Sequence, residues 1–129
     1  MLDQIIKTKR DRINALKEHY KINDHLDLKP RKFFQTLFES SNVYKIIGEI
    51  KKASPSAGII KEDFDLLGLA NDYISSGISN LSVLTEEDYF LGQYEYIAQI
   101  KEYLDIKILQ KDFITVSYTH LTLPTTPYV

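Results

Sequence analysis

The chain has 129 residues, of which 43% are hydrophobic, and its 18 acidic and 16 basic side chains leave a formal net charge of -2. This balance gives no electrostatic basis for binding nucleic acid or an anionic membrane. The absence of cysteine excludes disulfides, a thiolate nucleophile and a cysteine zinc site. No apolar run is long enough to cross a bilayer, so we expect a cytoplasmic protein with a modest core.

Two helices are predicted in the first 44 residues. Apolar side chains at helical spacing predict an amphipathic helix that ends near Tyr20. Its basic residues fall largely on the opposite side and are expected to face solvent: Lys7, Lys9, Arg10 and Arg12. A short apolar stripe after Pro30 predicts a second helix: Phe33, Phe34, Leu37 and Phe38. These aromatic residues either pack on the body that follows or cover a binding site.

From residue 45 onward, strands and helices are predicted to alternate. The strands cover residues 45–52, 80–85 and 107–114, at a spacing of about thirty residues, the length of one βα unit. The first helix between them begins after Asp63 or Asp65 and ends before Gly77, and the second covers residues 94–103. This order predicts the α/β class, with parallel strands joined by right-handed crossovers.

Polar side chains follow each predicted strand. Period-two alternation puts Glu49 and Lys51 on one face of the first strand. The second strand finishes with Thr85 and Glu86, and the third with Lys111 and Asp112. Because the carboxyl ends of parallel strands meet at one edge, we expect these groups to converge there. They are either part of an active site or structural ion pairs. Phe113 shares a face with Lys111, which suits an aromatic, oxygen-rich substrate, or it belongs to the core.

Two further features are weaker signals. The turn at residues 54–58 (SPSAG) offers hydroxyl and backbone N–H groups that suit a phosphate, or it is an ordinary turn. The three histidines lack an acidic or histidine partner at ligand spacing and are expected at the surface: His19, His25 and His120. The sequence therefore predicts no metal site.

Three segments, in this order and spacing, closely resemble one enzyme family: IIGEIKKASPSAGII, GISNLSVLTEEDYFLGQ and ILQKDFI. That family is indole-3-glycerol-phosphate synthase, and the resemblance extends from Met1 to about Ile114. It implies a (β/α)₈ TIM barrel, of which this chain would hold a helical N-terminal extension and the first three strands. The expected fold is therefore a partial TIM barrel.

The resemblance also implies a reaction and the residues that perform it. The family closes 1-(2-carboxyphenylamino)-1-deoxyribulose 5-phosphate to indole-3-glycerol phosphate, a step of tryptophan biosynthesis that loses carbon dioxide and water without a cofactor. By resemblance, Lys111 is the general acid, Lys51 contacts the substrate and Glu49 assists proton transfer. Four more residues are implied to line the substrate site: Ser54, Ser56, Phe90 and Phe113. The implied partner is this small phosphosugar-anthranilate substrate.

The sequence predicts three regions: an N-terminal extension at 1–44, the first βα units at 45–115, and a separate tail at 116–129. Every Asp, Glu, Lys and Arg lies before Thr115, and residues 116–125 of the tail, VSYTHLTLPTTPYV, resemble a translated transposon sequencing adapter. A divergent β-hairpin is the alternative for the tail. We expect a truncated chain that is inactive alone, because the phosphate-binding loops of the later strands are missing. A small, non-catalytic α/β module that binds a phosphosugar or anion is the alternative function.

Overall fold

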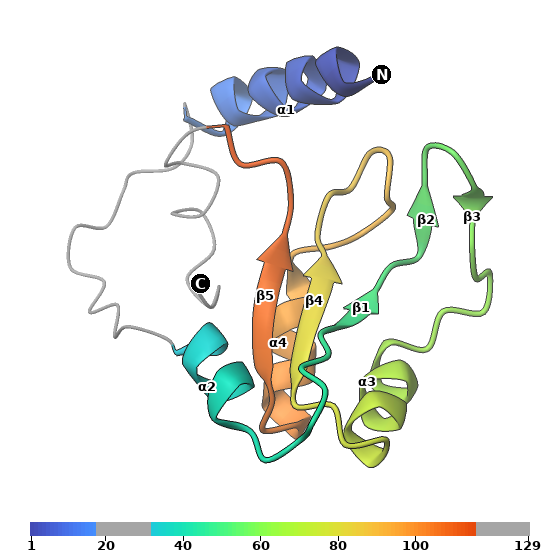
Figure 1. Ribbon diagram of the computed structural model, residues 1–129. Helices are drawn as coiled ribbons and strands as arrows, with labels where there is room; N and C mark the ends of the chain where they lie inside the picture. Colours follow the sequence, from blue (N-terminus) through green and yellow to red (C-terminus); the bar gives the residue numbers. More distant parts are fainter. Residues whose placement is uncertain (18–31, 116–129) are drawn as a thin grey trace.

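The computed structural model describes residues 1–17 and 32–115 and has an α/β architecture (Figure 1). The predictions for Tyr20, Pro30, the three histidines and the tail lie outside these residues. In chain order the elements are α1 (Leu2–Lys17), α2 (Phe33–Glu39), β1 (Gly48–Ile50), β2 (Ala53–Ser54), β3 (Gly58–Ile59), α3 (Leu66–Ser75), β4 (Asn80–Leu84), α4 (Glu95–Tyr103) and β5 (Lys107–Lys111). In this part of the chain, no helix is both long and apolar enough to cross a membrane.

The main sheet has three parallel strands in the order β1-β4-β5, which confirms the predicted α/β class. Its register places Glu49 opposite Ser82, and Leu84 opposite Lys111. Each pair of neighbouring strands is joined through a helix, as parallel strands require. The strands point toward α1, which lies at their carboxyl ends, whereas α2 lies near their amino ends (Figure 1).

The first strand is shorter than the predicted 45–52, and its approach is not buried. Tyr44 and Ile46 are exposed, and β1 covers only Gly48–Ile50. The chain then leaves the sheet and forms a small antiparallel pair, in which Ala53 lies opposite Ile59. Gly58 begins β3 directly after the turn with φ of 65°, a conformation that glycine adopts without strain. The predicted strand is therefore reduced to three residues, and a hairpin that the sequence did not predict follows it.

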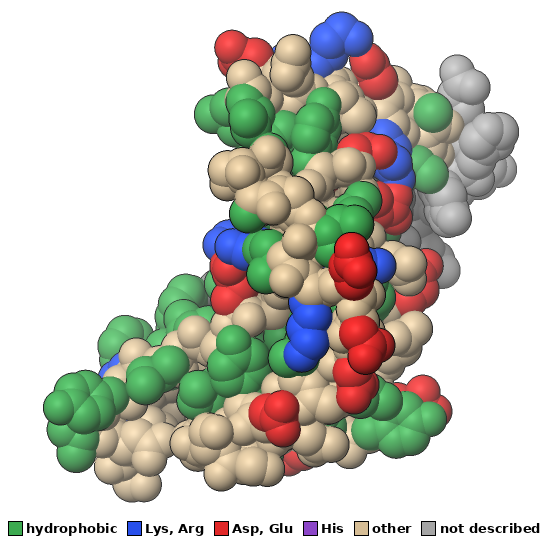
Figure 2. All heavy atoms as spheres, turned by 90° about the vertical axis from the view of Figure 1, so that its right-hand side faces the viewer, with side chains coloured by type: hydrophobic (Ala, Val, Ile, Leu, Met, Phe, Trp, Pro, Cys, Tyr) green, Lys and Arg blue, Asp and Glu red, His purple; other side chains and the backbone are tan. Residues whose placement is uncertain are grey.

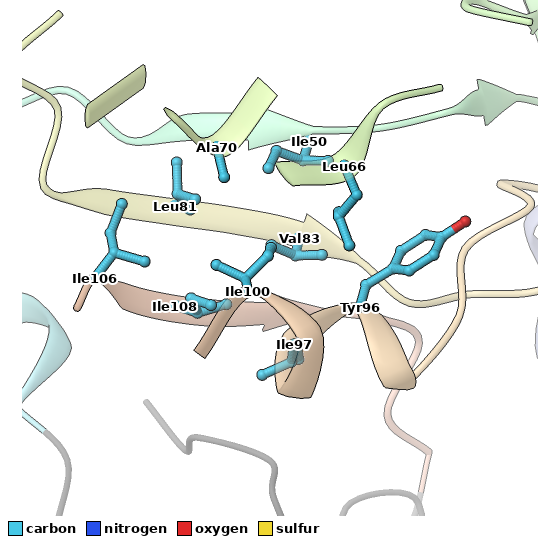
Figure 3. Close-up of a cluster of buried hydrophobic side chains, with 10 residues drawn as sticks. All are labelled: Ile50, Leu66, Ala70, Leu81, Val83, Tyr96, Ile97, Ile100, Ile106 and Ile108. Atoms are coloured by element: carbon cyan, nitrogen blue, oxygen red, sulfur yellow. The ribbon is translucent and has the colours of Figure 1, made fainter. Parts of the chain in front are cut away.

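The hydrophobic core lies between the sheet and helices α3 and α4 (Figure 3). Asp65 caps α3, because its carboxylate accepts the backbone N–H of Gly68 at 3.0 Å, and Gly77 follows the helix with φ of 87°. The structure thus selects Asp65 over the alternative Asp63 as the cap and confirms that the helix ends before Gly77. The core residues are Ile50, Leu66, Ala70, Leu81, Val83, Tyr96, Ile97, Ile100, Ile106 and Ile108.

The prediction that Lys9 faces solvent is wrong. Its side chain is 2% exposed, and it lies on the buried face of α1 between Ile5 and Ile13. These three residues are spaced four apart, so they share one side of the helix. An acidic partner on another element, described below, makes this position acceptable for a lysine.

Several apolar side chains are exposed near the amino ends of the strands. Helix α2 buries Phe33 and Leu37 against the body but leaves two of its phenylalanines exposed. Figure 2 shows hydrophobic side chains gathered at the lower end of the face in view. The exposed group comprises Phe34, Phe38, Val43, Tyr44, Ile46 and Ile47. The predicted aromatic cluster therefore packs on the body with only part of its surface.

Candidate active site

Three charged side chains meet at the carboxyl ends of β1 and β5. One carboxylate oxygen of Glu49 lies 2.9 Å from Nζ of Lys51, and the other lies 2.7 Å from Nζ of Lys111. Both contacts confirm the predicted geometry: Glu49 and Lys51 share a face, and the first and third strands bring their charges together. The three groups, here called the ionic cluster, are partly open to solvent, with 32–54% of each side chain exposed.

The ionic cluster keeps its glutamate charged. The hydrogen bond from Lys111 lowers the pKa of Glu49, and the hydrogen bond from Lys51 adds to this effect, while burial acts against it. At neutral pH, Glu49 is therefore an anion that positions the side-chain nitrogens of Lys51 and Lys111. As ammonium groups, these side chains can hold an anionic ligand or donate a proton to an oxygen that develops negative charge.

Beside the ionic cluster lies a hollow of about 470 Å³. Lys51 lines it together with Ser54 and Ser56 of the β2–β3 turn and Phe90 of the loop after β4. The rest of the lining is apolar and comes from Pro55, from Met1 and from the first turns of α1 at Leu2 and Ile5. A hollow of this size, with an apolar wall and a few polar groups, is typical of a small-molecule site.

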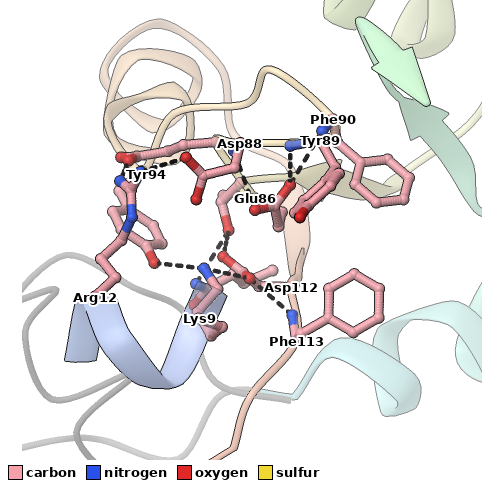
Figure 4. Close-up of polar contacts among 12 residues, drawn as sticks. Lys9, Arg12, Glu86, Asp88, Tyr89, Phe90, Tyr94, Asp112 and Phe113 are labelled. Atoms are coloured by element: carbon pink, nitrogen blue, oxygen red, sulfur yellow. Dashed lines mark hydrogen bonds and ion pairs between the residues drawn. The ribbon is translucent and has the colours of Figure 1, made fainter. Parts of the chain in front are cut away.

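Two aromatic rings lie at the strand ends, and a buried carboxylate fixes one of them. The rings of Phe90 and Phe113 have centroids 6.1 Å apart at an angle of 39°. The carboxylate of Glu86 accepts the backbone N–H groups of Asp88, Tyr89 and Phe90 at 2.8–3.0 Å (Figure 4). Glu86, noted in the sequence only as a polar strand end, therefore shapes the loop that carries Phe90.

A second buried carboxylate, Asp112, was not assigned this role by sequence reasoning. Its side chain is fully buried and lies 2.8 Å from Nζ of Lys9 in α1 (Figure 4). The Thr85 hydroxyl donates to its other oxygen at 2.9 Å, and the backbone N–H of Phe113 donates to the first at 2.7 Å. Lys9 also donates to the Tyr94 hydroxyl at 3.2 Å. The only feature of the sequence that indicates a buried Lys9 is its position midway between Ile5 and Ile13, on the apolar side of the helix.

Opposing effects set the pKa of each group around this ion pair. Burial favours neutral Lys9, but the hydrogen bond and negative charge of Asp112, together with Tyr94, outweigh burial and raise the pKa of Lys9. Burial raises the pKa of Tyr94, and the charge of Asp112 adds to this. Lys9 is therefore a cation at neutral pH, and Tyr94 is a neutral phenol.

Helix α1 has additional contacts with the loop after β4. Arg12 forms ion pairs with Glu87 and Asp88, the latter at 2.7 Å. Thr8 and Tyr89 share a hydrogen bond of 3.3 Å between their hydroxyl groups. These contacts place the amino end of α1 over the hollow. Among the described residues, no group of three His, Asp or Glu side chains is placed to hold a metal ion.

The fold and the site together define a class of protein. Parallel strands, joined through helices, bring charged side chains to one sheet edge, beside a hollow of ligand size. This is an α/β protein with the kind of site that α/β enzymes build at the carboxyl ends of their strands.

Comparison with known proteins identifies the family. A family model described as indole-3-glycerol phosphate synthase matches residues 2–120, and the chain therefore belongs to this family. A relative of that name from Campylobacter fetus is 41% identical over 126 residues, covering 92% of this chain and 47% of the relative. One from Sulfurimonas denitrificans is 39% identical, with 92% and 48% covered. One from Acetivibrio thermocellus is 48% identical over 86 residues, with 67% and 33% covered. The chain spans about half the length of the first two relatives.

Proposed function

We propose that this chain is the N-terminal part of an indole-3-glycerol-phosphate synthase, a carboxy-lyase of tryptophan biosynthesis. The observation that carries the proposal is the ionic cluster, in which Glu49, Lys51 and Lys111 meet beside a hollow of ligand size. The family match supports the same reaction. The proposed substrate is 1-(2-carboxyphenylamino)-1-deoxyribulose 5-phosphate.

The proposed fold of the whole protein is a TIM barrel, to which this chain contributes the first three strands. In the described part of the chain, β1 and β5 form the two edges of the sheet, and a barrel would pair both. The exposed apolar group near the amino ends of the strands is also explained if more protein packs there. In this proposal, residues 1–44 are an extension, residues 45–115 are the first βα units, and residues 116–129 are a separate tail, of which the family match reaches residue 120.

In the proposed reaction, Lys111 is the general acid. Its ammonium group would protonate the ketose carbonyl oxygen of the substrate while the ring carbon that bears the carboxylate attacks the carbonyl carbon. The new carbon–carbon bond makes that ring carbon tetrahedral. Loss of carbon dioxide then returns the electron pair of the broken bond to the ring. The hydroxyl formed from the carbonyl leaves as water after a second protonation, and loss of a proton from the substrate completes the indole.

The other residues of the site would bind and orient the substrate. Lys51, 2.9 Å from Glu49, supplies a positive charge for an anionic part of the substrate, and Glu49 would help to move protons. Ser54 and Ser56 line the same hollow as Lys51 and would contact polar substrate atoms. Phe90 and Phe113 would pack against the anthranilate ring, since such a ring gains from aromatic contact.

A chimera tests the proposal: residues 1–115 of this chain followed by the C-terminal half of the Campylobacter fetus relative. We expect it to form indole-3-glycerol phosphate, measured by the fluorescence of the indole. Lys111→Ala should lower kcat by about 10²–10⁴-fold, the usual contribution of a general acid. Lys107→Ala, at the other end of the same strand, is the matched control and should keep its activity. An inactive chimera, or a Lys111→Ala variant with normal turnover, would refute the proposal.

A non-catalytic anion-binding module is the second candidate, because Lys51, Ser54 and Ser56 line a hollow within this chain alone. Calorimetric titration of the 129-residue chain with inorganic phosphate tests this function. The module predicts heat of binding that Lys51→Met removes. A titration without heat would reject it.

A further inference from the structure

Three consecutive residues at the end of β5 point to three different partners. Lys111 contacts Glu49 of the ionic cluster, the Asp112 side chain pairs with Lys9 of α1, and the Phe113 ring lies against Phe90. We propose that the Lys9–Asp112 pair is a buried latch through which α1 fixes the positions of Lys111 and Phe113. Lys9 is then a positioning residue for the reaction. This inference rests on the proposed synthase function.

The hydrogen bonds of Asp112 explain how the latch acts on its neighbours. Its carboxylate accepts from α1 through Lys9, from the end of β4 through Thr85, and from the backbone N–H of Phe113. The backbone carbonyl of Lys111 accepts the N–H of Thr85 at 3.0 Å. The backbone on both sides of Asp112 is thus held, and with it the directions of the Lys111 and Phe113 side chains. A shift of Asp112 would move both.

The latch also determines where α1 lies. The Lys9 side chain is 2% exposed, and its amine has two partners, the Asp112 carboxylate and the Tyr94 hydroxyl. If α1 slid along the sheet edge, the Lys9 ammonium group would stay buried but lose its counter-ion, which is unfavourable, so the pair holds α1 in one position. Apolar contacts at Ile5 and Ile13 alone would not impose this precision, since they have no preferred direction.

One consequence is a connection between two walls of the site. Met1 and the first turns of α1, through Leu2 and Ile5, line the hollow that Lys51 and Phe90 also line. The latch therefore sets the distance between this apolar wall and the proposed acid, Lys111. A substrate that fills the hollow would meet Lys111 correctly only with α1 in place.

Kinetics of the chimera test the latch. Lys9→Met keeps an apolar side chain of similar length and removes the charge. We expect kcat to fall by about 100-fold, the effect of misplacing a catalytic group by about 1 Å, while KM should change by less than about threefold. Lys7→Met is the matched control, because Lys7 pairs with Asp11 on the exposed side of the same helix, and it should leave kcat unchanged. Assays are run at a temperature where circular dichroism shows all variants fully folded. A Lys9→Met variant with kcat within about twofold of the parent would overturn the latch.

A double variant shows whether Lys9→Met and Asp112→Asn disturb the same interaction or cause two independent defects. Asp112→Asn alone should also lower kcat, and Lys9→Met added to it should cause little further loss, because the pair acts as a unit. Additive losses would refute the inference.

Hydrogen exchange of the 129-residue chain supplies a readout independent of turnover. Exchange in residues 2–17 and in residues 111–115 should become at least about tenfold faster in Lys9→Met and stay unchanged in Lys7→Met. Unchanged exchange at 111–115 in Lys9→Met, or a parent chain whose α1 exchanges like an unfolded peptide, would refute the latch. An inactive parent chimera refutes the synthase proposal instead, and the exchange experiment still decides on the latch.

Discussion

The free energy of unfolding offers a direct test of the buried Lys9–Asp112 pair. The two side chains are 2% and 0% exposed, and Nζ lies 2.8 Å from the carboxylate. Removing one partner of such a pair costs about 3–5 kcal/mol, since the remaining charge stays buried without its counter-ion. In Lys9→Met, Asp112 would keep its hydrogen bonds from Thr85 and Phe113, so we expect the lower end, about 3 kcal/mol.

Urea unfolding of the 129-residue chain, followed by circular dichroism, measures this cost. With a slope of about 1.5 kcal/mol/M, the midpoint should fall by about 2 M. The control is Lys7→Met, whose ion pair with Asp11 is 79% and 64% exposed and should leave the midpoint unchanged. If Lys9→Met lowers the free energy of unfolding by less than about 1 kcal/mol, the pair contributes no more than a surface ion pair does. That result would refute the burial of Lys9.

Three further changes test the fold around the site. Gly48→Ala should cost about 1–3 kcal/mol, because its methyl group would lie 2.8 Å from the Tyr73 ring; in a Tyr73→Ala background this cost should vanish, and a cost that persists in urea unfolding contradicts the packing. The lowered pKa of Glu49 means that its ion pairs stabilise the fold fully above the ordinary value of 4.5 and that this stability is lost as the pH falls through the lower, folded pKa. The difference in urea midpoint between the parent and Glu49→Gln should therefore shrink as the pH falls below 4.5, and a difference that grows would reverse the sign of the reasoning. Glu86→Gln should speed hydrogen exchange at the backbone N–H of Phe90 by about tenfold or more, since a charged acceptor is lost; unchanged exchange would exclude this role of Glu86.

The ionic cluster was predictable because two simple rules produce it. Alternation along a strand puts Glu49 and Lys51 on one face, and parallel pairing brings the end of β5 to the same sheet edge. These rules predict that Glu49 and Lys111 reach the same sheet edge, and the structure adds that they form an ion pair of 2.7 Å across the end of β4. The role of Glu86 was not predictable, because it depends on a loop conformation that turns three backbone N–H groups toward one carboxylate.

The sequence alone determined the order of the three sheet strands and their two helices, the parallel sheet and the end of α3 before Gly77, because these depend on local periodicity and on a helix-stopping glycine. The structure chose Asp65 over Asp63 as the cap of α3. Only the tertiary structure decided where the first strand leaves the sheet, since residues 53–59 form a hairpin of their own. It also decided that Lys9 is buried. A lysine on a helix has no local preference for the interior, and its partner Asp112 lies at the far end of the described chain, where only folding brings the two charges together.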